Sequence, residues 1–156
     1  MLKKVKSKLA VAKGASIALV ASKYNALYVD AMLKAAQREL SRAGAKVRVV
    51  RVPGAFEIPA AAAQLAAMDP KPAAIICLGV IFQGQTSHAE HISWGVTHAL
   101  AGIQVQQRMP VIHGVFVFEE KEHARVRCLG KTHNRGTEAA QTALEMVKVF
   151  SGLKAR

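Results

Sequence analysis

An uninterrupted apolar run at residues 74–81, AIICLGVI, is the feature that most constrains the fold. A strand with one face in water alternates apolar and polar side chains, whereas a strand buried on both faces is apolar throughout. Pro70 and Pro72 precede the run and prevent a helix from continuing into it. The run therefore predicts a strand of a parallel sheet that helices cover on both sides.

Strand-like runs alternate with helical segments along the chain. Strands are predicted at residues 16–21, 46–52, 74–81 and 110–118. Helices are predicted at residues 27–43, 57–68, 87–107, 119–128 and 136–150, the first of them capped by Asn25. Because such alternation produces right-handed βαβ units, the predicted fold class is α/β. We expect a three-layer α/β/α sandwich with a four-stranded parallel sheet and flavodoxin-like topology.

The length and composition fit one domain that carries a basic N-terminal extension. The chain has 156 residues, 51% of them hydrophobic, which suffices for a buried core. We expect the extension at residues 1–14 and the domain at residues 15–156. The extension lacks the long apolar centre of a signal peptide, and no apolar run is long enough to span a membrane. The expectation is a cytoplasmic protein without membrane contact.

The net charge of +12 raises the question of nucleic-acid binding, because basic surfaces attract phosphates. The lysines and arginines are dispersed, however, and do not alternate with aromatic residues as in RNA-binding segments. We therefore expect no dedicated nucleic-acid partner. Attraction of anionic substrates, or solubility alone, explains the charge better.

The segment after the apolar run combines a glycine, two polar residues and a histidine at the start of a predicted helix. Gln85 and Thr86 follow Gly84, and free N–H groups at a helix N-terminus bind phosphate. His88 is a candidate general acid or base, because its ordinary pKa lies near physiological pH. Ordinary helix capping and a surface histidine are the alternatives. The HAEH sequence at residues 88–91 lacks the HExxH spacing, so no metal site is expected.

Two further segments lie where ligands bind in parallel sheets. Residues 53–57, PGAFE, join a strand to a helix through Gly54, which permits close backbone approach to a flat ligand. Residues 127–136 form a cationic segment with two glycines, and its Arg127 suits phosphate recognition. The alternatives are a plain turn for the first segment and a solvated loop for the second.

Four motifs in register together resemble the lumazine synthase family of riboflavin biosynthesis. They are VPGAFEIP at residues 52–59, GVIxxGxTxH at 79–88, PVIxG at 110–114 and GKxxNxGxEAA at 130–140. The resemblance runs from about residue 16 to the end of the chain, with order and spacing intact. It implies condensation of 5-amino-6-(D-ribitylamino)uracil with 3,4-dihydroxy-2-butanone 4-phosphate. The products are 6,7-dimethyl-8-ribityllumazine, phosphate and water, and neither a metal nor an organic cofactor is required.

The resemblance also implies roles for individual residues. His88 would transfer protons. The residues implied in binding the pyrimidine ring and ribityl chain are Tyr24, Asn25, Gly54, Ala55, Phe56, Glu57, Val80, Ile81, Phe82 and His113. The residues implied in binding phosphate are Gln85, Thr86, Arg127, Lys131 and Arg135.

Several positions depart from the usual family pattern. The family often has arginine where this chain has Gln83, a small residue at Gln85, phenylalanine at His113 and lysine at Arg135. These changes affect the expected affinity and pH profile rather than the presence of activity. Arg125, two residues before Arg127, could share the phosphate role.

The resemblance further implies a homo-oligomer whose active sites lie between the subunits of a pentamer. Family members form pentamers, pairs of pentamers or icosahedral shells of sixty subunits, and riboflavin synthase could be a partner. The basic N-terminal segment could add a strand between subunits. Two alternatives stay open, namely a riboflavin synthase of the archaeal type and a non-catalytic protein that binds lumazine or flavin.

Overall fold

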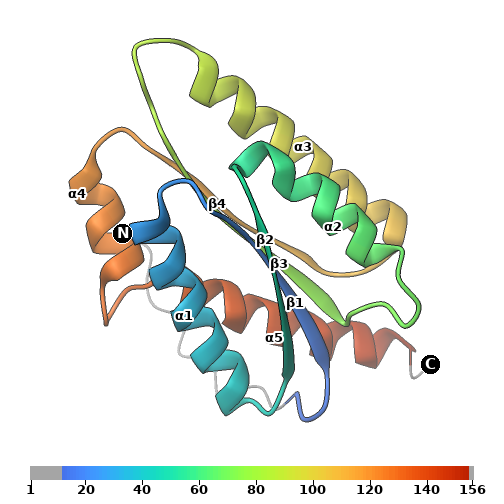
Figure 1. Ribbon diagram of the computed structural model, residues 1–156. Helices are drawn as coiled ribbons and strands as arrows, with labels where there is room; N and C mark the ends of the chain where they lie inside the picture. The colour runs from blue at the N-terminus through green and yellow to red at the C-terminus, as the bar shows by residue number, and fades with distance from the viewer. Residues whose placement is uncertain (1–11, 155–156) are drawn as a thin grey trace.

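The computed structural model describes residues 12–154 and contains one four-stranded parallel sheet (Figure 1). The strands are β1 at Ser16–Ser22, β2 at Lys46–Val52, β3 at Ala74–Phe82 and β4 at Val111–Phe118. Their order in the sheet is β2-β1-β3-β4, and all neighbours pair in parallel. The α/β prediction is therefore confirmed. Most of the predicted N-terminal extension, with the intersubunit strand suggested for it, lies outside the described residues.

Two helices cover each face of the sheet, which gives the predicted three layers (Figure 1). On one face lie α1 at Ala26–Arg42 and α5 at Arg135–Lys154. On the other lie α2 at Ile58–Ala66 and α3 at His88–Gln107. No helix among residues 12–154 is long and apolar enough to cross a membrane.

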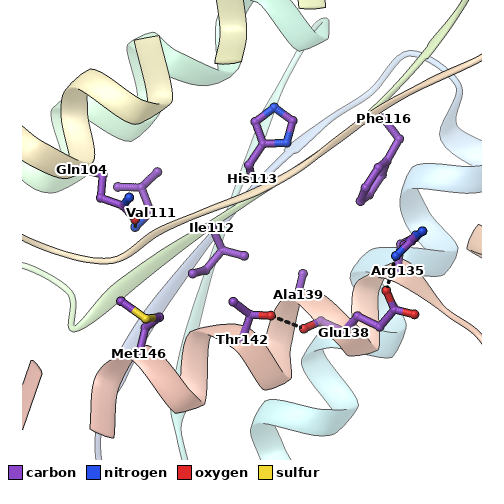
Figure 2. Close-up of a pocket in the computed structure, with 10 residues that line it drawn as sticks. All are labelled: Gln104, Val111, Ile112, His113, Phe116, Arg135, Glu138, Ala139, Thr142 and Met146. Carbon is purple, nitrogen blue, oxygen red and sulfur yellow. Dashed lines mark hydrogen bonds and ion pairs between the residues drawn. The ribbon is translucent and has the colours of Figure 1, made fainter. Parts of the chain in front are cut away.

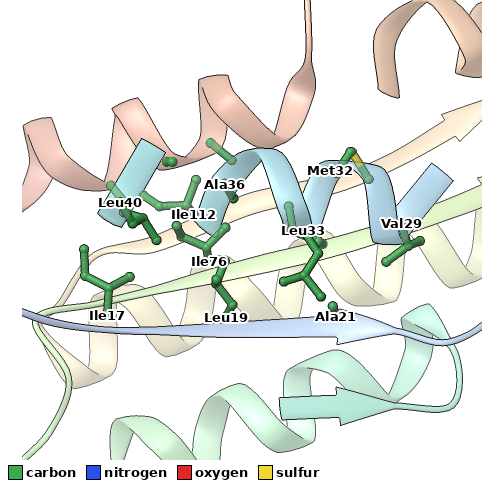
Figure 3. Packing of buried hydrophobic residues seen from close by; sticks show 14 of the residues in the cluster. Ile17, Leu19, Ala21, Val29, Met32, Leu33, Ala36, Leu40, Ile76 and Ile112 are labelled. Atoms are coloured by element: carbon green, nitrogen blue, oxygen red, sulfur yellow. The ribbon is translucent and has the colours of Figure 1, made fainter. Parts of the chain in front are cut away.

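The first seven residues of β3 are all buried, because β3 contributes to two separate hydrophobic clusters. Ile76 and Leu78 pack toward α1 and α5, and Ile75 and Cys77 pack toward α2 and α3. Figure 3 shows Ile76 beside the side chains of β1 beneath α1. Full burial of one such aliphatic side chain stabilises the fold by about 1.5–3 kcal/mol. The uninterrupted apolar run thus reflects burial on both faces.

Three predicted helices differ from the observed ones in extent. The helix expected at residues 57–68 begins with the 3-10 turn η1 at Ala55–Glu57, and α2 ends at Ala66. The helix expected at residues 119–128 is instead one short helix, α4 at Lys121–Ala124, followed by the π-helical turn η2 at Arg125–Leu129. The last helix, α5, continues four residues beyond the predicted end at residue 150.

Gly136 brings the start of α5 directly against the backbone of α1. A Cβ atom at Gly136 would overlap the carbonyl group of Met32, whose side chain is fully buried. We expect Gly136→Ala to lower the free energy of unfolding by about 1–3 kcal/mol, since neither backbone can yield without repacking. Chemical denaturation would measure this change.

Gly152 offers a matched control in the same helix, because a Cβ atom there would meet no atom within 4 Å. Gly152→Ala should leave stability unchanged or raise it by up to about 1 kcal/mol, since alanine favours helix. Equal effects of the two substitutions would contradict the role assigned to Gly136.

Candidate active site

The loop between β1 and α1 is held by its neighbours at the carboxyl ends of the strands. Arg51 of β2 donates a hydrogen bond from Nη2 to the carbonyl oxygen of Ser22 at 3.0 Å and forms an ion pair with Asp30 at 2.8 Å. The backbone N–H of Tyr24 donates to the carbonyl oxygen of Pro53 at 3.0 Å. These contacts fix the backbone that presents the Tyr24 ring.

Asn25 does not cap α1 with its side chain, so that prediction is wrong. Asn25 precedes the helix in the left-handed region, with φ 57°, and forms no side-chain cap bond. Its Nδ2 instead donates to the carbonyl oxygen of Val80 at 2.7 Å. The pairing of β1 with β3 ends at Leu78, whereas β3 pairs with β4 through Phe82. The Asn25 amide therefore satisfies a carbonyl that has lost its strand partner.

Beyond Leu78, the β1 side of β3 is open, and this is the stretch predicted to contact the pyrimidine. Val80 is buried, while Ile81 and Phe82 are partly exposed. The Phe82 ring packs edge-on against Tyr28, with ring centroids 5.5 Å apart. The backbone of this stretch is therefore held in place while part of its surface stays accessible.

Gly54 lies directly beneath the Tyr24 ring. A Cβ atom at Gly54 would come within 2.9 Å of two ring carbons, so only glycine leaves room for the tyrosine here. The Gly54 N–H donates to Glu57 Oε2 at 2.8 Å. Tyr24 and Phe56 are 66% and 60% exposed, whereas Ala55 is buried. The two aromatic rings and the Glu57 carboxylate are thus presented to solvent at the strand ends.

The segment before α3 leaves the N-terminus of that helix open. Ser87 occupies the capping position but forms no cap bond, because its hydroxyl lies 3.2 Å from Nε2 of His91. The His88 N–H makes only a long hydrogen bond, 3.4 Å, to the Thr86 hydroxyl. The first N–H groups of α3 therefore remain available to an anion. His88, the first residue of α3, is exposed beside them.

Gln83 shapes this loop in a way that sequence reasoning missed. Its Nε2 donates to the carbonyl oxygen of Thr86 at 3.1 Å, which closes the turn over residues 83–86. Gln85 is exposed within the same turn. Within residues 12–154, no group of three or more His, Cys, Asp or Glu side chains is arranged to hold a metal ion.

Arg125 and Arg127 differ in whether a carboxylate already binds their side chains. Arg125 makes two hydrogen bonds to the Glu122 carboxylate, at 2.8 and 2.6 Å, and this contact lowers the pKa of Glu122. Arg127 is exposed and pairs with no carboxylate among the residues that the structure describes. Lys131 is also exposed. Arg127 is therefore the arginine of this turn whose charge is left for a ligand.

A groove of about 420 Å³ runs along the outer edge of β4, between α3 and α5 (Figure 2). We call it the β4 groove; its lining residues are Gln104, Val111, Ile112, His113, Phe116, Arg135, Glu138, Ala139, Thr142 and Met146. His113 Nε2 lies 2.9 Å from the Thr97 hydroxyl of α3. Arg135 forms an ion pair with Glu138 at 2.6 Å and stacks over the Phe116 ring, 5.5 Å from its centroid. Two predicted site residues, His113 and Arg135, thus share this groove.

The His113 end of the β4 groove lies far from His88 within one chain. His88 begins α3, and Thr97, the partner of His113, is nine residues further along the same helix. A rise of 1.5 Å per residue separates them by about 13–14 Å along the helix axis. One chain therefore does not bring His113 to His88.

The parallel sheet, the open helix N-terminus and the adjacent histidine are typical of α/β enzymes that use acid–base chemistry on an anionic substrate. The family model described as 6,7-dimethyl-8-ribityllumazine synthase matches residues 14–151. A relative of that name from Stenotrophomonas maltophilia is 38% identical over 144 residues, covering 90% of this chain and 92% of the relative. Another of that name, from Xanthomonas campestris pv. campestris, is 39% identical over 139 residues, covering 87% of this chain and 90% of the relative. The chain belongs to the 6,7-dimethyl-8-ribityllumazine synthase family.

His113 should make stability depend on pH. Partial burial lowers the pKa of His113 below its ordinary value of 6.5, so the unfolded chain takes up a proton at a higher pH than the folded chain. Stability is then lost as the pH falls below 6.5. We expect His113→Phe to reduce the fall in Tm between about pH 7.5 and about pH 5.5. An unchanged fall in Tm would assign the effect to another group.

Proposed function

We propose that this chain condenses 5-amino-6-(D-ribitylamino)uracil with 3,4-dihydroxy-2-butanone 4-phosphate to 6,7-dimethyl-8-ribityllumazine, phosphate and water. This is a transferase reaction of riboflavin biosynthesis, and it fits the family to which the chain belongs. The observation that carries the proposal is the exposed His88 at the open N-terminus of α3. The reaction needs proton transfers and a phosphate site, and this element would supply both.

The pyrimidine substrate would bind at the carboxyl ends of β1, β2 and β3, beside Tyr24, Phe56 and Glu57. The exposed Tyr24 ring offers a stacking surface, and the Phe56 ring, which lies against Gly95 of α3, is exposed as well. The Glu57 carboxylate uses one oxygen on the Gly54 N–H and has lone pairs left for ribityl hydroxyls. Backbone groups of residues 80–82 would contact the uracil ring where β1 no longer pairs with β3. Asn25 would keep that backbone in place.

The phosphate substrate would bind at the N-terminus of α3. The N–H groups that follow Gln85 and Thr86 would hold the phosphate, and Arg127 would add a bidentate contact. His88 would carry protons during Schiff-base formation, phosphate elimination and ring closure. Lys131 and Arg135 would raise the positive potential around the leaving phosphate. No metal or organic cofactor is part of this proposal.

The active site would form between two copies of the chain in a homo-oligomer. Within one chain, Thr97, which contacts His113, lies about 13–14 Å along α3 from His88, so a second copy would supply His113 to the substrate. Residues 91–107 of α3 contain no Asp, Glu, Lys or Arg, and they expose Trp94 and Val105 by 61% and 75%. An uncharged face with large exposed apolar side chains favours self-association.

The proposed assembly is built from pentamers. A single pentamer, a pair of pentamers and a sixty-subunit icosahedral capsid differ greatly in mass, so sedimentation velocity would distinguish them. A cytoplasmic location agrees with the two free, buried cysteines, Cys77 and Cys128. Riboflavin synthase, which would use the product, is a candidate partner.

One assay tests the reaction. Purified protein is mixed with both substrates, and lumazine fluorescence and phosphate release are followed against the spontaneous background. A rise in both lumazine fluorescence and released phosphate above background supports the proposal, and a rate no higher than background would refute it. Riboflavin formed from added lumazine would point to an archaeal-type riboflavin synthase, and binding without turnover to a non-catalytic protein. No observation on the described residues favours either alternative.

His88→Ala should lower kcat by about tenfold to a hundredfold, at or below the contribution usual for a general acid or base. The effect is expected at the low end because the condensation also proceeds spontaneously. Pyrimidine binding, measured by fluorescence titration, should be largely preserved. His123→Ala, which removes an exposed histidine of α4, is the control and should retain most of the turnover. Unchanged turnover in His88→Ala would remove His88 from the mechanism.

Arg127→Ala should raise the KM for the butanone phosphate by about tenfold to a hundredfold, because hydrogen bonds to charged groups contribute about 1.5–3 kcal/mol. The KM for the pyrimidine should change little. Arg125→Gln is the control, since the Arg125 guanidinium is already bound to Glu122. Steady-state kinetics with each substrate varied in turn would measure both constants. A selective effect on the pyrimidine would contradict the assignment.

A further inference from the structure

We propose that Asn134 is a positioning residue that fixes the η2 turn and thereby aims Arg127 at the substrate phosphate. The inference rests on the proposed phosphate role of Arg127. Asn134 belongs to the GKxxNxGxEAA motif, but it has no part in the proposed reaction. Its side chain joins the end of η2 to the beginning of α5.

Both polar atoms of the Asn134 amide are engaged. The Nδ2 atom donates to the carbonyl oxygen of Cys128, the residue after Arg127, at 2.6 Å. The Oδ1 atom accepts from the N–H groups of Gly136 at 2.8 Å and Thr137 at 3.4 Å. The second pair of contacts is a helix N-cap. The first is a separate bond from that cap to the backbone of the arginine turn.

The two ends of this bridge rest on the same rigid element, α1. Cys128 is fully buried in the hydrophobic cluster that includes α1. Gly136 lies against the carbonyl group of Met32 in α1. Both anchors are therefore set by core packing, and Asn134 connects them directly.

The intervening loop has little room to adjust. A Cβ atom at Gly130 would lie 2.7 Å from the carbonyl oxygens of both Val126 and His133, so these two carbonyls converge on the glycine. The π-helical turn ends at Leu129, and Gly130 is extended, with ψ 148°. The Cys128 carbonyl at this end of the turn takes its hydrogen bond from Asn134 rather than from a following helical residue.

Fixing the backbone matters for Arg127 because nothing else among the described residues holds its side chain. Arg125 is held by Glu122, and Arg135 by Glu138 and Phe116. Arg127 has no comparable ion pair within residues 12–154. A long free side chain loses conformational entropy when it binds a ligand. If the backbone of the turn is already fixed, binding does not have to order the main chain as well.

Only an amide can supply both contacts at this position. Aspartate and serine are good N-cap residues, so they keep an acceptor for the start of α5. Neither has an N–H donor for the Cys128 carbonyl, since ionised aspartate only accepts and the serine hydroxyl is one atom shorter. Asn134→Asp and Asn134→Ser therefore separate the two functions of the side chain.

The test compares the kinetics of these variants in the full-length protein. Asn134→Ser should raise the KM for the butanone phosphate by about threefold to tenfold, the loss expected for one hydrogen bond. The KM for the pyrimidine should stay within about twofold, and Tm should fall by only a few degrees, because one internal hydrogen bond is lost. Asn134→Asp should act in the same direction, and Arg125→Gln should leave both constants unchanged.

A double-mutant cycle with Arg127→Ala decides whether Asn134 acts through that arginine. In the Arg127→Ala background, Asn134→Ser should have no further effect on the KM for the butanone phosphate. A persistent effect, equal changes in both KM values, or loss of folding in both Asn134 variants would overturn the inference. If Arg127→Ala raises this KM but Asn134→Ser does not, only the role of Asn134 fails. If Arg127→Ala itself has no effect, the proposed phosphate role fails.

Discussion

The burial of β3 on both faces is the constraint on which the rest of the structure depends. Its side chains enter the clusters under α1 and α5 on one face and under α2 and α3 on the other. β3 also pairs with β1 and β4 along its edges, so its side chains and its backbone are satisfied together. Backbone pairing stops where one strand extends beyond the end of its neighbour. β3 outlasts its pairing with β1 after Leu78, and the candidate site lies there.

The chemistry of the site follows from groups that the fold leaves partly unsatisfied. Beyond Leu78, where β1 no longer pairs with β3, the Val80 carbonyl accepts a hydrogen bond from the Asn25 side chain. At the start of α3, the Ser87 hydroxyl contacts His91 and does not cap the helix. The helix dipole and the free N–H groups then favour an anion beside His88. Close packing supplies the remaining order, because Gly54 lets the Tyr24 ring lie against the backbone. Binding groups are thus held before a ligand arrives.

The length of α3 separates the site residues into two sets. His88 lies at the start of the helix, and His113 contacts Thr97 well along it. A rigid helix cannot fold back to join them, which is the physical reason for proposing a site shared by two copies. The β4 groove and the η2 turn would then serve as the second half, with Asn134 holding the arginine turn to the start of α5.

The sequence by itself determined the strand order along the chain, the burial of residues 74–81, the four motifs and the place of His88 at a helix start. These features are local, since they depend on hydrophobic periodicity, glycines and helix-start residues. Only the tertiary structure decided that Asn25 bonds to Val80, that Gln83 closes its own turn, and that Glu122 occupies Arg125 but not Arg127. It also decided the distance between His113 and His88. The Asn25–Val80 contact and the distance between the two histidines depend on which elements pack together. The Gln83 and Arg125 contacts join residues three apart, and they depend on the exact turn of each segment, which hydrophobic periodicity does not specify.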